Sequence, residues 1–457
     1  MIQSLQHIEN VFFIGIGGIG MSALARYLFH IGKNISGYDV CETELTRELI
    51  NESIPVFYTD DITLIPKDFF KTATLVVRTP AVPDNLEVLK TWREYKIPVI
   101  RRSQMLAAIA ENHKVYAVSG THGKTTITTL LSHLLNQRAE KINSFMGGIA
   151  VNYETNVLFS SGTNDMVVEA DEYDRAFLLL NPHAAIVTSI DADHLDIYRT
   201  HENIIAAFNE FINKIDKSGL LIYKKSLPVT ISDSLKARTY DVENSEADIY
   251  ARNVYINDDR TFTFDLIISG QVYEKLHLGV LGWYNLENAV AASAMALFAG
   301  INYDELRQGL KSFKGVKRRF EVLCSGQEIY IDDYAHHPNE IAACLKSVKG
   351  IYPQKHITAI FQPHLYSRTR DFFDDFVTAL SEANTVIITD IYAAREVDLG
   401  DINAKQLAEH IQGGIYIPKN EILKYITDNN FEVLVTMGAG NIGEFAHTIQ
   451  KIINKRS

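Results

Sequence analysis

The feature that most constrains the fold is a glycine-rich loop between an apolar run and an amphipathic run. Residues 115–118 (VYAV) have the pattern of a buried strand, residues 120–126 follow as GTHGKTT, and the sequence ITTLLSHLLNQ continues with helical spacing. In a strand–loop–helix of this kind, backbone N–H groups and the helix N-terminus face a phosphate group. The sequence therefore predicts an α/β fold with a phosphate-binding loop near the middle of the chain.

The residue types in this loop fit nucleotide binding. Lys124 would contact the β- and γ-phosphate oxygens, and the hydroxyl of Thr125 would reach Mg²⁺. The general pattern has a glycine at position 118, where this chain has Val118, so an ordinary glycine-rich turn is the alternative interpretation. The residues expected to bind the nucleotide are Gly120, Thr121, His122, Gly123, Lys124, Thr125 and Thr126.

Strand-like and helical patterns alternate along the whole chain, which predicts parallel sheets with crossover helices. A length of 457 residues suggests about three domains. We place the boundaries near residues 112 and 315, which gives domains 1–112, 113–315 and 316–457. Further strands are predicted at residues 11–14, 74–77, 98–100, 166–168, 185–188, 329–331, 358–361, 385–389 and 433–437.

Composition excludes several classes of protein. The net charge of -12 argues against a protein that coats nucleic acid, although a few local cations can still hold a phosphate. The longest apolar stretch, 289–301, is too short to span a bilayer. The N-terminal apolar run is expected to be a strand and not a signal peptide, and the three widely spaced cysteines give no disulfide framework. We expect a cytoplasmic protein without membrane insertion, either a monomer or a weak homodimer.

Two acidic clusters follow predicted strands downstream of the phosphate loop. Residues 166–168 lead into Glu169-Ala170-Asp171-Glu172-Tyr173-Asp174, and residues 185–188 lead into a turn with three aspartates and His194. Carboxylate oxygens at the end of a buried strand suit Mg²⁺ beside nucleotide phosphates. A solvated acidic turn with a capping aspartate is the alternative for either cluster. The pair Arg101-Arg102 is expected to lie on a solvated face.

A second glycine motif opens the chain. Gly15, Gly17, Gly18 and Gly20 follow the first predicted strand, and Asp39 lies about twenty residues after them. This is also the dinucleotide-binding fingerprint, so residues 1–100 alone would favour an NAD-dependent oxidoreductase. The phosphate loop and the two acidic clusters argue against it, because hydride transfer has no use for them. A noncatalytic GTP switch is a further alternative, but it does not explain a third domain.

With GTHGKTT, EADEYD and DADHLDIY in this order, the chain resembles the Mur ligases, which build the peptidoglycan stem peptide. The resemblance continues through GWYNLENAVAA at 282–292, GVKRRFE at 315–321, DDYAHHPNE at 332–340, QPHLYSRTRDFFDDF at 362–376 and MGAGNIG at 437–443. The resemblance implies three domains: a Rossmann-like UDP-substrate domain, a P-loop ATPase-like central domain and a Rossmann-like C-terminal domain. The glycine loop looks like that of the alanine-adding member.

The resemblance also implies a reaction. ATP would phosphorylate the lactyl carboxylate of UDP-N-acetylmuramate, and the amine of L-alanine would attack the acyl phosphate. Catalysis would lie mainly in positioning and in neutralising phosphoryl charge. By position, Thr125 and Glu169 would hold one Mg²⁺ ion, and Glu169 and His194 a second. The residues expected to be catalytic are Lys124, Glu169, His194 and Arg319.

Other roles are carried over from the family by position. Asn285 and Asn288, three apart on one helix face, would contact the adenine. Arg319 would reach the phosphates, and Asp333 would contact the ribose region. In the N-terminal domain, Gly15, Gly17, Gly18, Gly20 and Asp39 would bind the UDP-substrate. The residues expected at the amino acid or the sugar are Tyr334, His336, His364, Arg368 and Arg370, although His122, His336 and His337 could instead hydrogen-bond a turn.

Three positions depart from the family pattern. Trp283-Tyr284 replaces a common Arg-His pair, and Leu365 stands where a basic residue is frequent. Several Mur ligases carry a carbamylated lysine about fifteen residues after the motif histidine, but this count reaches Asn209, so no carbamate is predicted. Within the family, the alternative is the recycling ligase that attaches a whole tripeptide to UDP-N-acetylmuramate. The absence of an inserted loop between the two acidic motifs favours L-alanine.

Overall fold

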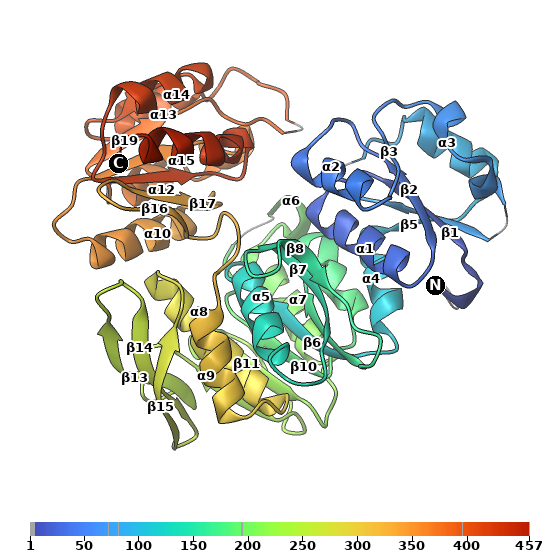
Figure 1. The fold of residues 1–457 in the computed structure, drawn as a ribbon, viewed down its shortest axis with the longest axis horizontal. Coiled ribbons are helices and arrows are strands. Elements are labelled where there is room, and N and C mark those ends of the chain that lie inside the picture. Colours follow the sequence, from blue (N-terminus) through green and yellow to red (C-terminus); the bar gives the residue numbers. More distant parts are fainter. Residues whose placement is uncertain (1–4, 72, 81, 193–194, 395, 457) are drawn as a thin grey trace. The chain divides into compact units, whose positions relative to one another are not determined.

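The computed structural model describes residues 5–71, 73–80, 82–192, 195–394 and 396–456. By packing, the chain divides into two compact units. Unit 1 consists of Met1–Val254, Phe264–His277 and Asn288–Phe313, and unit 2 consists of Tyr255–Thr263, Leu278–Glu287 and Lys314–Ser457. The chain forms three β-sheets, one in each of the three predicted segments (Figure 1).

The first sheet has five parallel strands in the order β3-β2-β1-β4-β5. The chain leaves β1 for β2 on one side and later returns to β4 on the other. The loop after β1, which carries the sequence GIGGIG, therefore lies at the switch point where open α/β sheets bind ligands. The elements are β1 (Asn10–Ile14), α1 (Ile19–His30), β2 (Asn34–Tyr38), α2 (Glu44–Asn51), β3 (Val56–Phe57), β4 (Thr74–Arg78), α3 (Glu87–Glu94), β5 (Val99–Arg101) and α4 (Arg102–Ala110).

The second sheet has ten strands in the order β15-β14-β13-β12-β11-β10-β6-β9-β7-β8. From β12 to β7 neighbouring strands are parallel, and β8 is antiparallel to β7. The strands are β6 (Lys114–Ser119), β7 (Asn143–Ala150), β8 (Thr155–Leu158), β9 (Asp165–Glu169), β10 (Ala184–Val187), β11 (Leu220–Lys224), β12 (Ala237–Tyr240), β13 (Ile249–Ile256), β14 (Phe262–Ile268) and β15 (Gln271–Leu278). The helices are α5 (Lys124–Leu135), α6 (Leu195–Tyr198), α7 (His201–Ile212), α8 (Trp283–Phe298) and α9 (Tyr303–Ser312).

The third sheet lies in unit 2 and has the order β16-β17-β21-β18-β19-β20. Only β16 is antiparallel to its neighbour, and the other strands are parallel. The strands are β16 (Glu321–Ser325), β17 (Ile329–Asp333), β18 (Ile357–Phe361), β19 (Thr385–Ile388), β20 (Ile415–Tyr416) and β21 (Val433–Met437). The helices are α10 (Pro338–Ile351), α11 (Tyr366–Asp371), α12 (Phe373–Leu380), α13 (Ala404–His410), α14 (Lys419–Asp428) and α15 (Ala446–Asn454).

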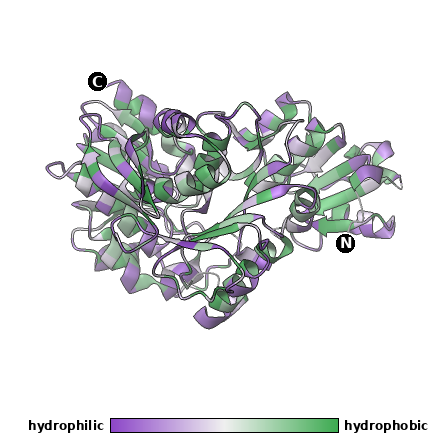
Figure 2. Ribbon diagram, turned by 90° about the horizontal axis from the view of Figure 1, so that it is seen from below, coloured by the Kyte–Doolittle hydropathy of each residue, from purple (hydrophilic) through white to green (hydrophobic). Residues whose placement is uncertain are grey.

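The central strands are buried on both faces, as their continuous apolar sequences predict. Every residue of β1, β18 and β21 is buried. In Figure 2 the strands beside the N-terminus are mostly coloured as hydrophobic, whereas the helices carry mixed colours. Such runs are typical of parallel strands covered by helices on both sides. All ten predicted strands are present, with ends that differ by at most two residues. Within the described parts of the chain, no helix has the length and apolar character needed to cross a bilayer.

Candidate active site

The phosphate loop joins β6 to α5 as predicted. Gly120 and Gly123 have φ angles of +134° and +80°, which L-residues with a side chain rarely adopt. A Cβ atom on Gly120 would also overlap the hydroxyl of Thr188, so both the φ angle and the available space require glycine at this position. Val118, the departure from the general pattern, is a buried residue of β6 that pairs with Glu169 and Ile186. Because the loop begins after the strand ends, valine at this position is compatible with the turn.

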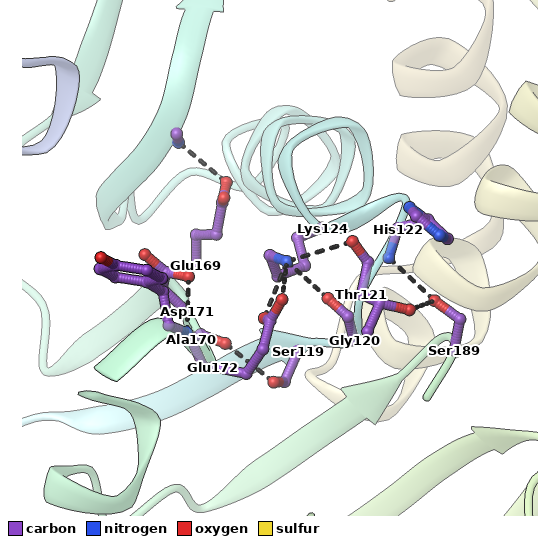
Figure 3. A network of polar contacts seen from close by, with 12 residues as sticks. Ser119, Gly120, Thr121, His122, Lys124, Glu169, Ala170, Asp171, Glu172 and Ser189 are labelled. Carbon is purple, nitrogen blue, oxygen red and sulfur yellow. Dashed lines mark hydrogen bonds and ion pairs between the residues drawn. The ribbon is translucent and has the colours of Figure 1, made fainter. Parts of the chain in front are cut away.

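The first half of the loop is held by the segment after β10. Ser189 accepts a hydrogen bond from the N–H of His122 at 2.8 Å and from the hydroxyl of Thr121 at 2.9 Å (Figure 3). The N–H of Thr121 donates to the carbonyl of Ser189 at 3.0 Å. The expectation that backbone N–H groups of the loop face phosphate is therefore wrong for Thr121 and His122. Gly123 is the N-cap of α5 and has no side chain for capping, so the first turn of α5 is where a phosphate would be bound.

His122 is placed by a carboxylate. Its Nε2 lies 2.9 Å from an oxygen of Asp191, and the N–H of Asp191 donates to the hydroxyl of Thr121 at 3.1 Å. Of the two interpretations of His122, the structure favours the one in which it supports a turn. Asp191 was expected in a metal-binding or acidic turn, and it lies against the phosphate loop.

Lys124 forms a buried ion pair that the sequence did not reveal. Its Nζ lies 2.9 Å and 2.8 Å from the two carboxylate oxygens of Glu172 and 2.6 Å from the carbonyl oxygen of Gly120 (Figure 3). The side chain of Glu172 is only 1% exposed. Burial of the amine opposes its charge, but Glu172, with Asp171 and Glu169, raises the pKa of Lys124 above its usual value. Lys124 is therefore a cation at the N-terminus of α5.

Glu169 lies at the end of β9, beside β6 in the sheet. Its carboxylate accepts a hydrogen bond from the N–H of Gly147 at 3.0 Å, and a Cβ atom on Gly147 would overlap it. Thr125 is buried in the first turn of α5. The expected second metal ligand, His194, lies outside the described residues. Among the described residues, no group of three or more His, Cys, Asp and Glu side chains is arranged to hold a metal ion.

The N-terminal glycine loop is shaped by Asp39. The carboxylate of Asp39 accepts the N–H of Gly17 at 2.6 Å, and a Cβ atom on Gly17 would lie 2.9 Å from the same oxygen. Gly15 has a φ angle of +85°. Gly18, in contrast, has an extended conformation, and an added Cβ atom would lie an ordinary 3.5 Å from its nearest neighbour, the carbonyl oxygen of Gly15. Asp39 therefore binds the loop itself. At Gly18, the protein alone leaves room for a side chain.

A cavity of about 300 Å³ in unit 1 lies between this glycine loop and the end of β9. Its lining includes Gly18 and Gly20 on one side and Glu169 and Asp171 on the other. Arg102 also lines it, and its guanidinium donates to Asp171 at 3.1 Å. The expectation that Arg101 and Arg102 form a solvated face is wrong for Arg102, because the tertiary fold brings the start of α4 to the acidic cluster.

The two asparagines of α8 differ in environment. Asn288 faces the phosphate loop, where its Oδ1 would be 3.0 Å from a Cβ atom on Gly123. Asn285 donates to the carbonyl of Leu281 at 2.6 Å. Both side chains are buried, and their role at the adenine stays a prediction.

Tyr284, one of the departures from the family pattern, and its partner Asp333 both belong to unit 2. Its hydroxyl donates to Asp333 at 2.8 Å, and burial, followed by the charge of Asp333, raises the pKa of Tyr284 well above its usual value. Asp333 also accepts the N–H groups of Phe320 and Ala335, both at 2.7 Å. Asp333 is thus a buried acceptor of three hydrogen bonds at the end of β17. Its contact with a ribose stays a prediction.

Arg319 and Tyr334 lie together. The guanidinium of Arg319 is 4.8 Å from the centre of the Tyr334 ring, within the range of a cation–π interaction. The neighbouring Arg318 is a structural residue, because it binds Asp332 at 3.0 Å and the carbonyl of Gly438 at 2.6 Å. Both arginines lie over the Tyr334 ring, since the guanidinium of Arg318 is 5.1 Å from its centre, but Arg318 is in addition bound to Asp332 and Gly438.

The remaining predicted residues of unit 2 are partly brought together. His336 and His364 have ring centres 6.0 Å apart, and His364 stacks on Tyr392. Arg368 and Arg370 lie on α11, where residues two apart do not share a face. Arg370 is exposed and binds Asp401 and Asp371. The two side chains therefore lie on different faces of α11, and the role of each at the amino acid or the sugar stays a prediction.

Comparison with known proteins agrees with the motifs at this site. Residues 10–114 match the family model described as "Mur ligase family, catalytic domain", residues 118–296 the "Mur ligase middle domain", and residues 318–440 the "Mur ligase, glutamate ligase domain". The chain belongs to the Mur ligase family. This Mur ligase is 43% identical to the UDP-N-acetylmuramate–L-alanine ligase of Porphyromonas gingivalis, over 98% of this chain and 99% of that protein. It is 42% identical to the protein of the same name from Flavobacterium psychrophilum, over 99% and 100% of the two chains.

Solved structures confirm the three-domain α/β fold of this Mur ligase. The UDP-N-acetylmuramate–alanine ligase MurC of Thermotoga maritima has a TM-score of 0.82 and 26% identity, and the match covers 98% of both chains. A murein peptide ligase of Psychrobacter arcticus has a TM-score of 0.70 and 19% identity, over 97% and 98% of the two chains. The second likeness, at this identity, concerns the fold alone.

Proposed function

We propose that this Mur ligase joins L-alanine to the lactyl carboxylate of UDP-N-acetylmuramate at the expense of ATP, the first step in building the peptidoglycan stem peptide. The observation that carries the proposal is the 43% identity to a UDP-N-acetylmuramate–L-alanine ligase over nearly the full length of both chains.

The described residues fit the nucleotide. When bound, ATP supplies the phosphoryl group that turns the carboxylate into an acyl phosphate. Lys124 is a buried cation at the start of α5, and the uncapped first turn of α5 offers N–H groups to phosphate oxygens. These groups are fixed before the reaction, so they can stabilise the charge that develops on the phosphoryl oxygens without reorganising.

The donor set near the loop fits a hard cation. Glu169 and Thr125 offer a carboxylate and a hydroxyl oxygen, which are ligand types that Mg²⁺ accepts. Asp171 and Glu172 add negative charge in the same segment. The charge of Lys124 is already paired with Glu172, and that of Arg102 with Asp171. We propose one Mg²⁺ held by Thr125 and Glu169. A second ion at Glu169 and His194 is the further part of the proposal.

Two rival activities are separated by the comparisons. The NAD-dependent oxidoreductase suggested by the first glycine motif does not fit a chain whose three segments all match Mur ligase family models. The tripeptide-adding ligase shares the fold, but two solved structures of such enzymes, one of them named a murein peptide ligase, are 19% and 23% identical to this chain. The higher identity to proteins named as alanine ligases favours L-alanine.

The test is release of phosphate with UDP-N-acetylmuramate, ATP and Mg²⁺ against a panel of amino acids and short peptides. We expect the highest kcat/KM for L-alanine, with L-serine and glycine weaker by roughly 10- to 200-fold, because a small pocket discriminates a methyl group only modestly. Faster turnover of the L-Ala-γ-D-Glu-diaminopimelate tripeptide than of L-alanine would replace this assignment with the recycling ligase.

A further inference from the structure

Arg102 occupies an electrostatically unfavourable position in unit 1. It is the first residue of α4, and its side chain reaches the beginning of α1, where its Nη1 would be 2.6 Å from a Cβ atom on Gly20. The N-terminus of a helix carries partial positive charge, so a cation at this end is electrostatically disfavoured at each helix. An anion that binds beside Arg102 would compensate for the positive charge at the two helix N-termini.

Arg102 binds an acidic residue from another part of the chain. Asp171, in the acidic cluster after β9, accepts its Nη2 at 3.1 Å. The other oxygen of Asp171 accepts the N–H of Tyr173 at 3.1 Å, so the carboxylate is fixed by its own turn. The two side chains are 28% and 32% exposed. A pair this open to water is weak, so an anionic ligand can replace the aspartate as the partner of Arg102.

The cavity beside Arg102 offers an anionic group this arginine, two glycines and the start of a helix, and two carboxylates also line it. It is lined by Gly18 and Gly20, which let a ligand approach the backbone, and by the start of α1. Glu169 and Asp171 line the opposite side, towards the phosphate loop. A volume of about 300 Å³ is at the lower end of the range for ligand pockets and suits one part of a larger molecule.

We propose that Arg102 binds an anionic group of the sugar-nucleotide substrate, either its diphosphate or its lactyl carboxylate, and that Asp171 holds Arg102 in place while the site is empty. The proposal rests on the proposed function for the identity of the substrate. On binding, the guanidinium exchanges Asp171 for the substrate anion. Asp171 is thus a positioning residue that competes with the substrate for the same cation.

Arg101 provides a matched control. It is the neighbouring arginine, is 60% exposed and binds Asp174 at 2.5 Å, and it does not line the cavity. The two arginines therefore have the same charge, adjacent positions and acidic partners three residues apart, but only one of them faces the glycine loop. A general effect of charge on a polyanionic ligand would appear in both variants, whereas a direct contact would appear in Arg102 alone.

The experiment is calorimetric titration of the full chain with UDP-N-acetylmuramate, without ATP or Mg²⁺. We expect Arg102→Ala to weaken binding about 10- to 100-fold, which is the usual effect of losing a charge-assisted hydrogen bond. Arg102→Lys should fall between the wild type and Arg102→Ala, and Arg101→Ala should be unchanged. Asp171→Asn should bind more tightly, because the competing charge is gone while the arginine remains.

The opposite signs for Arg102 and Asp171 distinguish binding from a structural role. If the pair only stabilised the fold, both variants would weaken the binding of UDP-N-acetylmuramate and of ADP alike, and that result would overturn the proposal. So would a folded Arg102→Ala protein that binds the sugar nucleotide as the wild type does. Titration with UDP separates the two anions: a loss with both ligands indicates the diphosphate, and a loss with UDP-N-acetylmuramate alone indicates the carboxylate. Product formation by the wild type with L-alanine is a separate measurement, so failure of the proposed reaction and failure of the Arg102 contact are distinguishable.

Discussion

At the scale of single residues, the pair Lys124–Glu172 joins binding chemistry to stability. The carboxylate is almost fully buried and the amine is 13% exposed. Removing one partner of such a pair leaves an uncompensated buried charge, which typically costs about 3–5 kcal/mol. The loss of Lys124, which we propose binds phosphate, should therefore also affect the fold.

We predict that Lys124→Met lowers the free energy of unfolding by about 3 kcal/mol and turnover by about 100-fold or more. The double variant Lys124→Met/Glu172→Gln should recover much of the stability, because the amide does not carry a charge into the interior, but none of the activity. Denaturant unfolding and phosphate release measure the two effects separately. Activity near the wild-type level in either folded variant would disprove the role of Lys124 at the phosphates.

At the scale of elements, the loop between β1 and α1 contains two glycines with different requirements. Gly17 is confined by Asp39 and by the methyl group of Thr46, which would lie 2.6 Å from an added Cβ atom. Gly18 has room for one in the empty loop. Substitutions at Gly17 and Gly18 should therefore separate an effect on stability from an effect on substrate binding.

We predict that Gly17→Ala destabilises the protein by about 1–3 kcal/mol through overpacking. Gly18→Ala should leave the unfolding free energy within about 0.5 kcal/mol of the wild type, but raise the KM for UDP-N-acetylmuramate about tenfold or more, with the KM for ATP unchanged. Steady-state kinetics with each substrate varied in turn provide the comparison. An equal rise in both KM values for Gly18→Ala would contradict a UDP-substrate site at this loop.

The end of β17 carries two adjacent buried carboxylates with raised pKa values. Burial raises the pKa of Asp332 to about 6, although Arg318 and Thr436 both stabilise its charged form. Between about pH 4 and pH 6 the folded protein therefore retains a proton that the unfolded chain has released. The free energy of unfolding should fall as the pH rises through this window and level off above it.

We predict that Asp332 contributes a fall on the order of 1–3 kcal/mol across the window, and that Asp332→Asn removes this part of the pH dependence. Unfolding at a series of pH values, with the wild type and the variant measured in parallel, isolates it from other carboxyl groups. A pH profile identical in shape for both proteins would show that Asp332 does not titrate there.

At the scale of the whole molecule, the division into two compact units predicts that unfolding is not a single transition. The phosphate loop, Lys124 and Glu169 all lie in unit 1. A ligand stabilises the unit that binds it, by about 2.7 kcal/mol when its concentration is 100 times its Kd. We expect ADP with Mg²⁺ to raise the transition temperature of unit 1 in scanning calorimetry, and Lys124→Met to reduce this shift. A ligand-induced shift of the same size in that variant would place the nucleotide elsewhere.

The sequence by itself determined the parts of this protein that depend on near neighbours in the chain. Alternating apolar and amphipathic runs predicted the three sheets, and glycines at 120 and 123 predicted a tight turn before a helix. Acids at the ends of apolar strands predicted carboxylates at the phosphate loop, since parallel strands bring their carboxyl ends to one edge. Each of these follows from local geometry, which a single sequence carries.

Only the tertiary structure decided which side chains meet. Glu172 as the partner of Lys124, Asp171 as the partner of Arg102 and Asp333 as the partner of Tyr284 all join segments far apart in the sequence. An acidic run does not state which of its carboxylates points inward, because this depends on the elements that pack against it. The helix α11, which separates Arg368 from Arg370, could likewise not be predicted, because its six residues are too few to show a helical pattern of apolar side chains. Partner choice depends on packing between elements, and packing is a property of the whole fold.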